Sequence, residues 1–251
     1  MSKPVRVLLV GAAGRLGRAI ATAAENHEQL RIVAQCGRGD DVRKCIRDAD
    51  VVIDVSHVDV AGGNCAAAAN AGKPLVIGTT GHSPEQLQLV MDAARTIPIV
   101  LAPNFSMGVN TLFWLARKAA ELLGDGFDIE IIETHHRLKK DAPSGTAKRL
   151  AEILCEVRSL HADEDVAHGR TGITGERPAR QIGMHAIRAG DVVGDHTVTF
   201  ASVGERLELT HKASSRDTFA HGAVRAATWI IGKAPGLYSM EDVLGLNDSA
   251  R

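Results

Sequence analysis

Residues 5–17 read VRVLLVGAAGRLG, and this stretch decides the fold of the first part of the chain. Residues 5–10 form an apolar run that only Arg6 interrupts, which is typical of a strand buried on both faces of a parallel sheet. Glycines follow at positions 11, 14 and 17, and residues 18–26 have the spacing of a helix. A strand, a glycine turn and the start of a helix, in this order, indicate the first half of a βαβ unit.

Each glycine of this turn has its own physical reason. Gly11 lets the chain turn sharply away from the strand, and Gly17 allows the helix to pack closely on the sheet. Gly14 has no Cβ, so backbone N–H groups and the positive end of the helix can approach a pyrophosphate. The motif predicts a dinucleotide site. Its G-x-x-G-x-x-G spacing places Ala13 where a glycine is common, and a tight structural turn remains the alternative.

The chain continues to alternate between strands and helices up to residue 106. We expect strands at 30–36, at 49–56, within 73–81 and within 97–105, and helices at 59–72 and 83–95. This alternation predicts a parallel sheet with right-handed crossovers. Ligands bind beyond the carboxyl ends of such strands, where residues 78–81 and 102–105 lie, although both segments could be ordinary loops.

The end of the second strand indicates which cofactor is preferred. Many NAD-binding folds place an acidic residue here, which binds the ribose 2′-hydroxyl. This chain has Gly37 followed by Arg38, and we do not expect Asp40 or Asp41 further along the loop to replace the acid. A missing carboxylate and an added guanidinium favour the 2′-phosphate of NADPH, with NADH still possible. For Arg38 a solvated loop cation is the alternative.

After residue 106 the pattern changes from alternation to runs of strands. We expect helices at 110–124 and 147–157, a strand at 128–137, and several antiparallel strands within 184–214. Their turns are predicted near residues 190–191, 194–195 and 204–205. This is typical of an α+β domain with an open mixed or antiparallel sheet. A last helix at 218–232 returns to the first domain, so we expect an α/β chain with domains of residues 1–106 plus 217–251 and 107–216.

Residues 133–146 read ETHHRLKKDAPSGT and concentrate titratable side chains in the second domain. A metal site, a solvated basic loop and an active site could each account for them. Because adjacent strand residues point to opposite faces, His135 and His136 are poorly placed to share a metal ion, and we expect no metal. Ser144, Gly145 and Thr146 form a turn before a helix, whose N–H and hydroxyl groups suit a carboxylate. Histidine and lysine beside such a pocket indicate acid–base chemistry.

The composition excludes several classes of protein. The chain of 251 residues has 29 Lys and Arg against 30 Asp and Glu, so no global charge favours nucleic acid or membrane binding. No apolar run approaches the roughly 20 residues of a membrane span, and the first residues lack a signal peptide. Cys36, Cys45, Cys65 and Cys155 lack zinc-like or redox-like spacing, as expected for reduced thiols of a cytoplasmic protein. For Cys155 a reactive thiol is the alternative.

The motif E-x-H-H-x-x-K-x-D-A-P-S-G-T-A at residues 133–147 resembles the signature of the 4-hydroxy-tetrahydrodipicolinate (dihydrodipicolinate) reductase family. The resemblance extends over nearly the whole chain, through residues 11–17, 76–81, 102–110, 174–196 and 204–216. It implies NAD(P)H-dependent reduction of a cyclic product of aspartate semialdehyde and pyruvate, on the route to diaminopimelate and lysine. It also implies a Rossmann-type cofactor domain, and a second domain that binds the substrate and assembles a homotetramer through its sheet.

The resemblance implies roles for particular residues. His135 matches the catalytic histidine, and Lys139 matches the general acid that supplies a proton. The predicted substrate ligands are His136, Ser144, Gly145, Thr146, Arg216 and Thr80. The predicted cofactor ligands are Gly11, Ala12, Ala13, Gly14, Arg15, Leu16, Arg38, Gly78, Thr79, Thr80, Ala102, Pro103, Asn104 and Phe105.

Two other functions remain as alternatives. A different Rossmann oxidoreductase, such as an aspartate or homoserine dehydrogenase, would share the first domain without the histidine–lysine motif. A non-catalytic NAD(P)-binding sensor would be favoured by loss of the lysine or of the glycine turn. The chain retains both Lys139 and Gly145, which favours the reductase.

Overall fold

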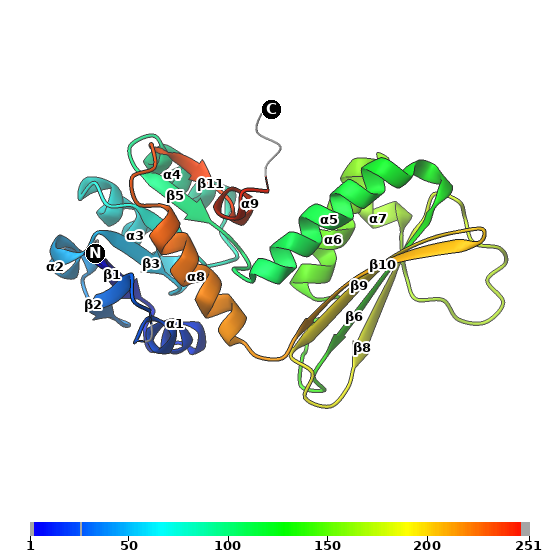
Figure 1. Cartoon of the computed structure of the whole chain (residues 1–251), viewed down its shortest axis with the longest axis horizontal. Coiled ribbons are helices and arrows are strands. Elements are labelled where there is room, and N and C mark those ends of the chain that lie inside the picture. The colour runs from blue at the N-terminus through cyan, green and yellow to red at the C-terminus, as the bar shows by residue number, and fades with distance from the viewer. Residues whose placement is uncertain (1–2, 26, 247–251) are drawn as a thin grey trace. The chain divides into compact units, whose positions relative to one another are not determined.

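The computed structural model describes residues 3–25 and 27–246, and it forms two compact units (Figure 1). Unit 1 comprises Met1–Met107 and Arg216–Arg251, and unit 2 comprises Gly108–Ser215. The chain therefore leaves the first unit once and returns to it through the segment that begins at Arg216. No helix of the described residues is long and apolar enough to cross a membrane.

Unit 1 is built on a parallel sheet of six strands, in the order β11-β5-β4-β3-β1-β2. The strands are β1 (Val5–Val10), β2 (Leu30–Cys36), β3 (Val51–Asp54), β4 (Leu75–Ile77), β5 (Pro98–Leu101) and β11 (Gly236–Tyr238). The predicted Rossmann-type sheet is confirmed, and β1 and β2 have the bounds expected from the sequence. The three-residue edge strand β11 was not predicted, because so short a segment shows no detectable alternation of apolar and polar residues.

Helices cover both faces of this sheet. They are α1 (Arg15–Glu25), α2 (Val42–Cys45), α3 (Val58–Asn70), α4 (Pro84–Ala94), α8 (Asp217–Trp229) and α9 (Met240–Leu244), with a 3-10 turn η1 (Ile46–Asp48). Val7 and Leu9 of β1 pack in one core with α1 and α8, whereas Leu8 packs in another core with α3 and α4. Both faces of β1 are thus buried, which explains its uninterrupted apolar sequence.

The late helix α8 belongs to unit 1 because it packs directly against the chain after β5. A Cβ on Gly222 would overlap the backbone carbonyl of Phe105, so only glycine permits this approach. Helix α8 also contacts α1, and Ala220 and Ala223 are fully buried in that core. The predicted return of the last helix to the first domain is therefore seen in the structure.

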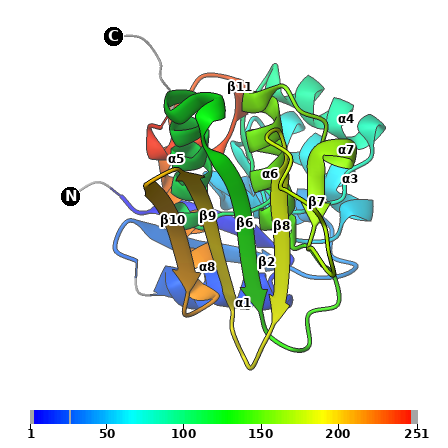
Figure 2. The same ribbon diagram turned by 90° about the vertical axis from the view of Figure 1, so that its right-hand side faces the viewer.

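Unit 2 contains a mixed sheet of five strands, in the order β10-β9-β6-β8-β7 (Figure 2). The strands are β6 (Asp128–His135), β7 (Val166–His168), β8 (Ile182–Arg188), β9 (Gly194–Ser202) and β10 (Glu205–Ala213). Strand β6 runs parallel to β8 and antiparallel to β9, and β10 is antiparallel to β9.

The predicted turn at residues 194–195 is wrong. Gly194 and Asp195 are the first residues of β9 and pair with Ala213 and Lys212 of β10. Asp195 also pairs with Thr134 of β6, so the Gly-Asp turn signal is overridden by neighbours on both sides. The chain turns between β8 and β9 at Gly190 and Asp191, where a turn was also predicted, and Gly190 has a φ of +48°.

One face of this sheet is covered by α5 (Met107–Leu123) and α6 (Gly145–Arg158), and two short helical turns, η2 (Gly124–Gly126) and α7 (Ala162–Asp165), complete the unit. Ile129 and Ile131 of β6 are buried in a core with residues of both long helices. Ile132, between them and the strand end, is exposed on the opposite face. By the same alternation Glu133 and His135 lie on the helix-covered face, which places them at the start of α6.

Candidate functional site

The glycine turn of unit 1 is tight at two of its three glycines. Gly11 has a φ of +84°, and a Cβ there would lie 2.6 Å from the carbonyl oxygen of Val55. A Cβ on Gly17 would overlap the carbonyl oxygen of Gly11, so helix α1 can start close to the turn only with glycine here. Gly14 is less crowded, since its nearest atom, the Gly11 carbonyl oxygen, would be 3.2 Å from an added Cβ.

The residues around this turn fit a dinucleotide. The first N–H groups of α1 have no partner within the helix, which makes its start a site for a phosphate. At the end of β4, the Thr79 hydroxyl is buried and has no hydrogen-bond partner among the described residues. A buried hydroxyl without a partner indicates a ligand that reaches it.

The other predicted cofactor residues lie at the same carboxyl edge of the parallel sheet. Ala12 and Ala13 belong to the turn after β1, Arg15 and Leu16 open α1, and Gly78 and Thr80 follow β4. Two residues after β5 have structural contacts: the Asn104 side chain accepts a hydrogen bond from Ser106 N at 2.8 Å, and Phe105 is buried against Gly78. Ala102 is buried and Pro103 is exposed.

The loop after β2 contains Arg38 and the two acids, Asp40 and Asp41. Gly37 N donates a hydrogen bond to Asp40 Oδ2 at 2.8 Å, so this carboxylate returns to the end of the strand. The loop folds onto itself through this local hydrogen bond, which brings the Asp40 carboxylate to the end of β2. Asp41 instead caps α2 and pairs with Arg43, and Arg38 is exposed.

In unit 2 the centre of the predicted cluster is Glu133, whose side chain is 0% exposed. Arg188 of β8 donates two hydrogen bonds to its carboxylate, from Nη1 to Oε2 and from Nη2 to Oε1, both at 2.9 Å. Ser144 N donates to Oε1 at 3.0 Å, and His135 Nδ1 lies 2.6 Å from Oε2. Burial alone would raise the pKa of Glu133, but the bonds from Arg188, His135 and Ser144 outweigh it and hold the pKa below its usual range.

The two predicted catalytic side chains lie on either side of a short turn. His135 is the last residue of β6 and is mostly buried, and His136 follows it. The backbone N–H of Lys139 donates to the carbonyl of His136, and Lys139 Nζ lies 2.9 Å from both carboxylate oxygens of Asp141. The hydrogen bond from Lys139 holds the pKa of the Asp141 carboxyl below its ordinary value. His136 Nδ1 is buried without a partner among the described residues.

The predicted carboxylate turn opens helix α6. Ser144 is its N-cap, and the hydroxyl accepts from Ala147 N at 3.2 Å and lies 3.1 Å from His196 Nε2. Because this hydroxyl is buried and already hydrogen-bonded, Ser144 stabilises the loop. Gly145 is exposed with nothing within 4 Å of an added Cβ, and Thr146 follows it in the first turn of the helix. Gly145 and Thr146 thus lie in the first turn of α6, the positive end of the helix, which attracts a carboxylate.

Two members of the cluster, Arg188 and His196, were not predicted from the sequence. The register of the sheet places both residues beside β6. Arg188 of β8 pairs with His135, and His196 of β9 pairs with Glu133. Burial and the neighbouring His135 lower the pKa of His196 to about 4, so it is neutral at neutral pH. The only sequence signal for these two residues was the spacing of polar residues on β8 and β9. That spacing shows which residues lie beside Glu133 only when the pairing register of the strands is known.

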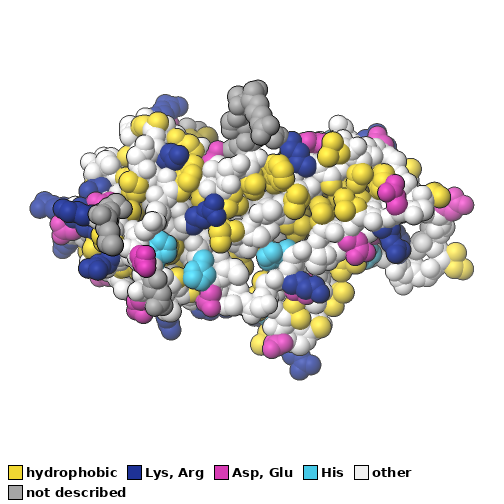
Figure 3. All heavy atoms as spheres, viewed as in Figure 1, with side chains coloured by type: hydrophobic (Ala, Val, Ile, Leu, Met, Phe, Trp, Pro, Cys, Tyr) yellow, Lys and Arg dark blue, Asp and Glu magenta, His cyan; other side chains and the backbone are white. Residues whose placement is uncertain are grey.

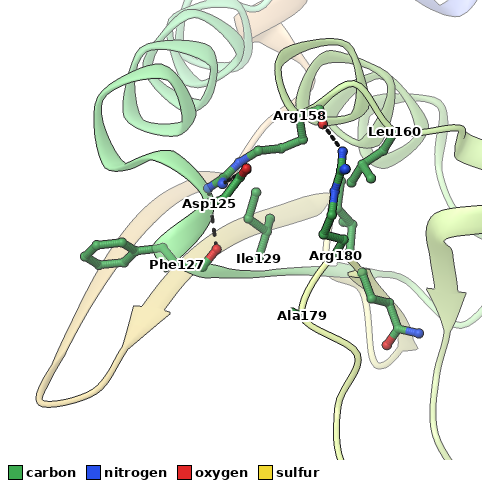
Figure 4. Close-up of a pocket in the computed structure, with 9 residues that line it drawn as sticks. Asp125, Phe127, Ile129, Arg158, Leu160, Ala179 and Arg180 are labelled. Carbon is green, nitrogen blue, oxygen red and sulfur yellow. Dashed lines mark hydrogen bonds and ion pairs between the residues drawn. The ribbon is translucent and has the colours of Figure 1, made fainter.

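Other polar groups of unit 2 have structural roles. On the opposite face of β6, Glu130 binds Arg170, Arg177 and His185, which ties residues 170–181 to the sheet. Figure 4 shows a second polar site, where Arg158 binds Asp125 and Arg180 binds the carbonyl of Arg158. That cavity of about 20 Å³ holds little more than one water molecule and is too small for a dicarboxylate.

Arg216 lies outside unit 2, which contains the cluster. Arg216, a predicted substrate ligand, is exposed and lies directly before α8 in unit 1, so it is not part of the unit that holds His135. Among the described residues no three His, Cys, Asp or Glu side chains are grouped to hold a metal ion. Figure 3 shows acidic and basic side chains interspersed over the visible face, without one large patch of a single sign.

Comparison with known proteins gives matches over nearly the whole chain. The family models described as dihydrodipicolinate reductase, N-terminus and C-terminus, match residues 5–105 and 108–244. A protein of Akkermansia muciniphila named 4-hydroxy-tetrahydrodipicolinate reductase is 54% identical over 243 residues, covering 97% of this chain and 99% of its own length. A protein of the same name from Syntrophotalea carbinolica is 44% identical, covering 96% of this chain and 99% of its own length.

Solved structures agree with these matches. Dipicolinate-bound dihydrodipicolinate reductase from Paenisporosarcina sp. TG-14 superimposes with a TM-score of 0.81 at 25% identity, covering 94% of this chain and 97% of its own. A diaminopimelate dehydrogenase of C. glutamicum shares only the fold, with a TM-score of 0.55 at 14% identity, covering 99% of this chain and 97% of its own.

The buried His196 predicts a specific loss of stability in acid. Because its pKa falls from 6.5 to about 4 on folding, the unfolded chain binds a proton below about pH 6.5 that the folded chain does not bind until about pH 4. The free energy of unfolding should fall by up to about 3 kcal/mol as the pH falls across that interval, because of this group. Urea unfolding of the wild type and of His196→Gln at several pH values measures this change. The free energy of unfolding should depend less on pH in His196→Gln, and an equal pH dependence in both proteins would contradict the prediction.

Proposed function

Because the chain belongs to the dihydrodipicolinate reductase family, we propose that it reduces 4-hydroxy-tetrahydrodipicolinate to tetrahydrodipicolinate with NAD(P)H, in diaminopimelate and lysine biosynthesis. The observation that supports this function most directly is the cluster in unit 2. His135, Lys139 and the start of α6 at Gly145 come from one continuous segment, and a buried carboxylate network holds that segment. Such a set suits proton transfer to a substrate with two carboxylates.

The chemistry assigns separate tasks to the two units. The bound cofactor supplies the hydride, and the net reaction replaces the 4-hydroxyl of the substrate with hydrogen and releases water, so one proton is consumed. In our proposal Lys139 delivers that proton, and the N–H groups of Gly145 and Thr146 bind one substrate carboxylate. His136 and Arg216 provide further positive or hydrogen-bonding groups for the dicarboxylate, with Thr80 as an additional ligand, and His135 contacts the reacting ring.

The proposed cofactor is NADPH by preference, with NADH possible. It would be held by the turn of residues 11–16, by residues 78–80 and by residues 102–105 of unit 1. Arg38 is exposed at the end of β2 and is available to a 2′-phosphate, which supports NADPH. Asp40 acts in the opposite direction, since its carboxylate bonds to Gly37 N at the same strand end and would repel a phosphate. The preference therefore depends on these two side chains.

We also propose that unit 1 is the dinucleotide-binding domain and unit 2 the substrate-binding and oligomerisation domain of a cytoplasmic homotetramer. The open face of the sheet in unit 2 supports this assembly, because Ile132 and Ile187 are large apolar side chains exposed there on two neighbouring strands. The four cysteines are unpaired, which is consistent with a reducing compartment.

The function is tested by an assay with freshly generated substrate. The product of aspartate semialdehyde and pyruvate is formed enzymatically, and nicotinamide oxidation is followed with NADPH and with NADH. We expect substrate-dependent oxidation with at least NADPH. Binding of a nicotinamide cofactor without any oxidation would favour the non-catalytic sensor instead.

Removing either proposed acid–base side chain should reduce turnover strongly. General acid–base groups contribute about 10²–10⁴-fold to a rate, so kcat of Lys139→Ala and of His135→Ala should fall by that factor while cofactor affinity stays nearly intact. Lys140→Ala is the matched control, because Lys140 is exposed next to Lys139. Near-normal turnover in Lys139→Ala would overturn its role as the proton donor.

The cofactor preference should respond to single substitutions at the end of β2. Arg38→Ala loses a charge-assisted contact to the 2′-phosphate and should weaken NADPH binding by about tenfold without affecting NADH. Asp40→Asn keeps an oxygen for Gly37 N but removes the negative charge, and should shift the preference towards NADPH. Dissociation constants from cofactor fluorescence measure both effects, and equal losses for the two cofactors in Arg38→Ala would contradict the proposal.

A further inference from the structure

We propose that Glu133 is a positioning residue that holds the His135 ring with its proton on Nδ1, while Arg188 and the N–H of Ser144 orient the carboxylate. His135 would then present an unprotonated Nε2 to the substrate. This inference deepens the proposed function and rests on it for the identity of the substrate, but the state of the His135 ring can be measured without any substrate.

The hydrogen bonds around Glu133 decide which ring nitrogen carries the proton. The guanidinium of Arg188 and the backbone N–H of Ser144 can only donate, so both carboxylate oxygens act as acceptors. These donors keep the carboxyl ionised, and an ionised carboxylate has no proton to give. The contact of 2.6 Å between Oε2 and His135 Nδ1 is therefore a bond that Nδ1–H donates.

Burial makes this arrangement stable. Glu133 is 0% exposed and its contacting partners come from three elements, so water cannot replace one of them. A carboxylate at this depth without donors would cost several kcal/mol, and each oxygen here has two. The charges of Glu133 and Arg188 cancel, so the pair directs the ring mainly through hydrogen-bond geometry.

The surroundings of Nε2 leave that atom accessible. A Cβ added to Gly194 would lie 3.0 Å from His135 Nε2, so the missing side chain keeps this side of the ring clear. The His196 ring contacts His135 edge-on, with ring centroids 5.2 Å apart, and fixes the tilt of the plane. Within the described part of the chain no residue forms a hydrogen bond to Nε2. This nitrogen can accept a proton or a hydrogen bond, which leaves proton donation to Lys139.

The test compares Glu133→Gln with the wild type by ¹⁵N NMR of histidine-labelled protein, with His135 assigned from His135→Gln. We expect Nδ1–H in the wild type. In Glu133→Gln the one remaining oxygen stays with Arg188 and Ser144 N–H, and the amide NH₂ faces the ring, so the proton should move to Nε2. The variant's kcat should fall by about 10²–10⁴-fold with little change in the KM of the cofactor.

Glu130→Gln is the matched control. Glu130 lies three residues earlier on the same strand and also binds arginines and a histidine, but on the opposite face of the sheet. Its substitution removes a comparable carboxylate and should leave the His135 proton on Nδ1. A purely structural role of Glu133 would instead lower stability in both variants without changing the ring.

Each outcome separates the inference from the proposed function. Nε2–H in the wild type, or an unchanged ring and turnover in Glu133→Gln, would overturn the positioning role. If Glu133→Gln does not fold, the wild-type spectrum still decides, because the inference requires Nδ1–H there. The predicted ring states without reductase activity in the wild type would contradict the proposed substrate and leave the positioning role supported.

Discussion

The buried ion pair of Glu133 and Arg188 is the constraint on which the organisation of unit 2 depends. A carboxylate with 0% exposure is tolerated only when donors surround it, and here they come from β6, β8 and the residue that caps α6. The pair therefore fixes the distance between two parallel strands and the start of a helix at once. Loss of Arg188 would leave the Glu133 carboxylate charged and buried, and breaking a buried pair in this way typically costs about 3–5 kcal/mol. The segment between His135 and Ser144 is held at both ends by this single group.

The position of β6 in the sheet explains why the cluster forms there. It is the central strand of five, so each of its residues has neighbours on both sides, and alternation sends Glu133 and His135 to the helix-covered face. The parallel neighbour β8 ends beside His135, which places Arg188 at the site. The antiparallel neighbour β9 begins there, which places Gly194 and His196. The carboxyl end of β8 and the amino end of β9 thus both lie beside the carboxyl end of β6.

Local signals in the sequence predicted the elements of unit 1 well, because its strands are buried on both faces and its glycine turn has a direct steric cause. They failed where a contact is not local. The Gly194 turn signal was overridden by pairing with β10 and β6. The motif of residues 133–146 identified the histidines, the lysine and the helix start. It could not predict Arg188 or His196, because their position beside Glu133 depends on the register of two strands that come much later in the chain.

The two acid–base contacts of the cluster differ in a way that matches their proposed tasks. Glu133 and His135 form a buried contact with several supporting bonds, so the ring has one orientation and one tautomer. Lys139 also binds a carboxylate, but the Asp141 side chain is 61% exposed, and exposed pairs of this kind contribute only about 0–1 kcal/mol. Lys139 can therefore exchange Asp141 for a substrate group at little cost. A proton donor has to change partners during each turnover, whereas a group that orients the substrate must not move. The buried Glu133 keeps His135 fixed, and the exposed Asp141 lets Lys139 change partners. These two carboxylates lie within nine residues of the chain.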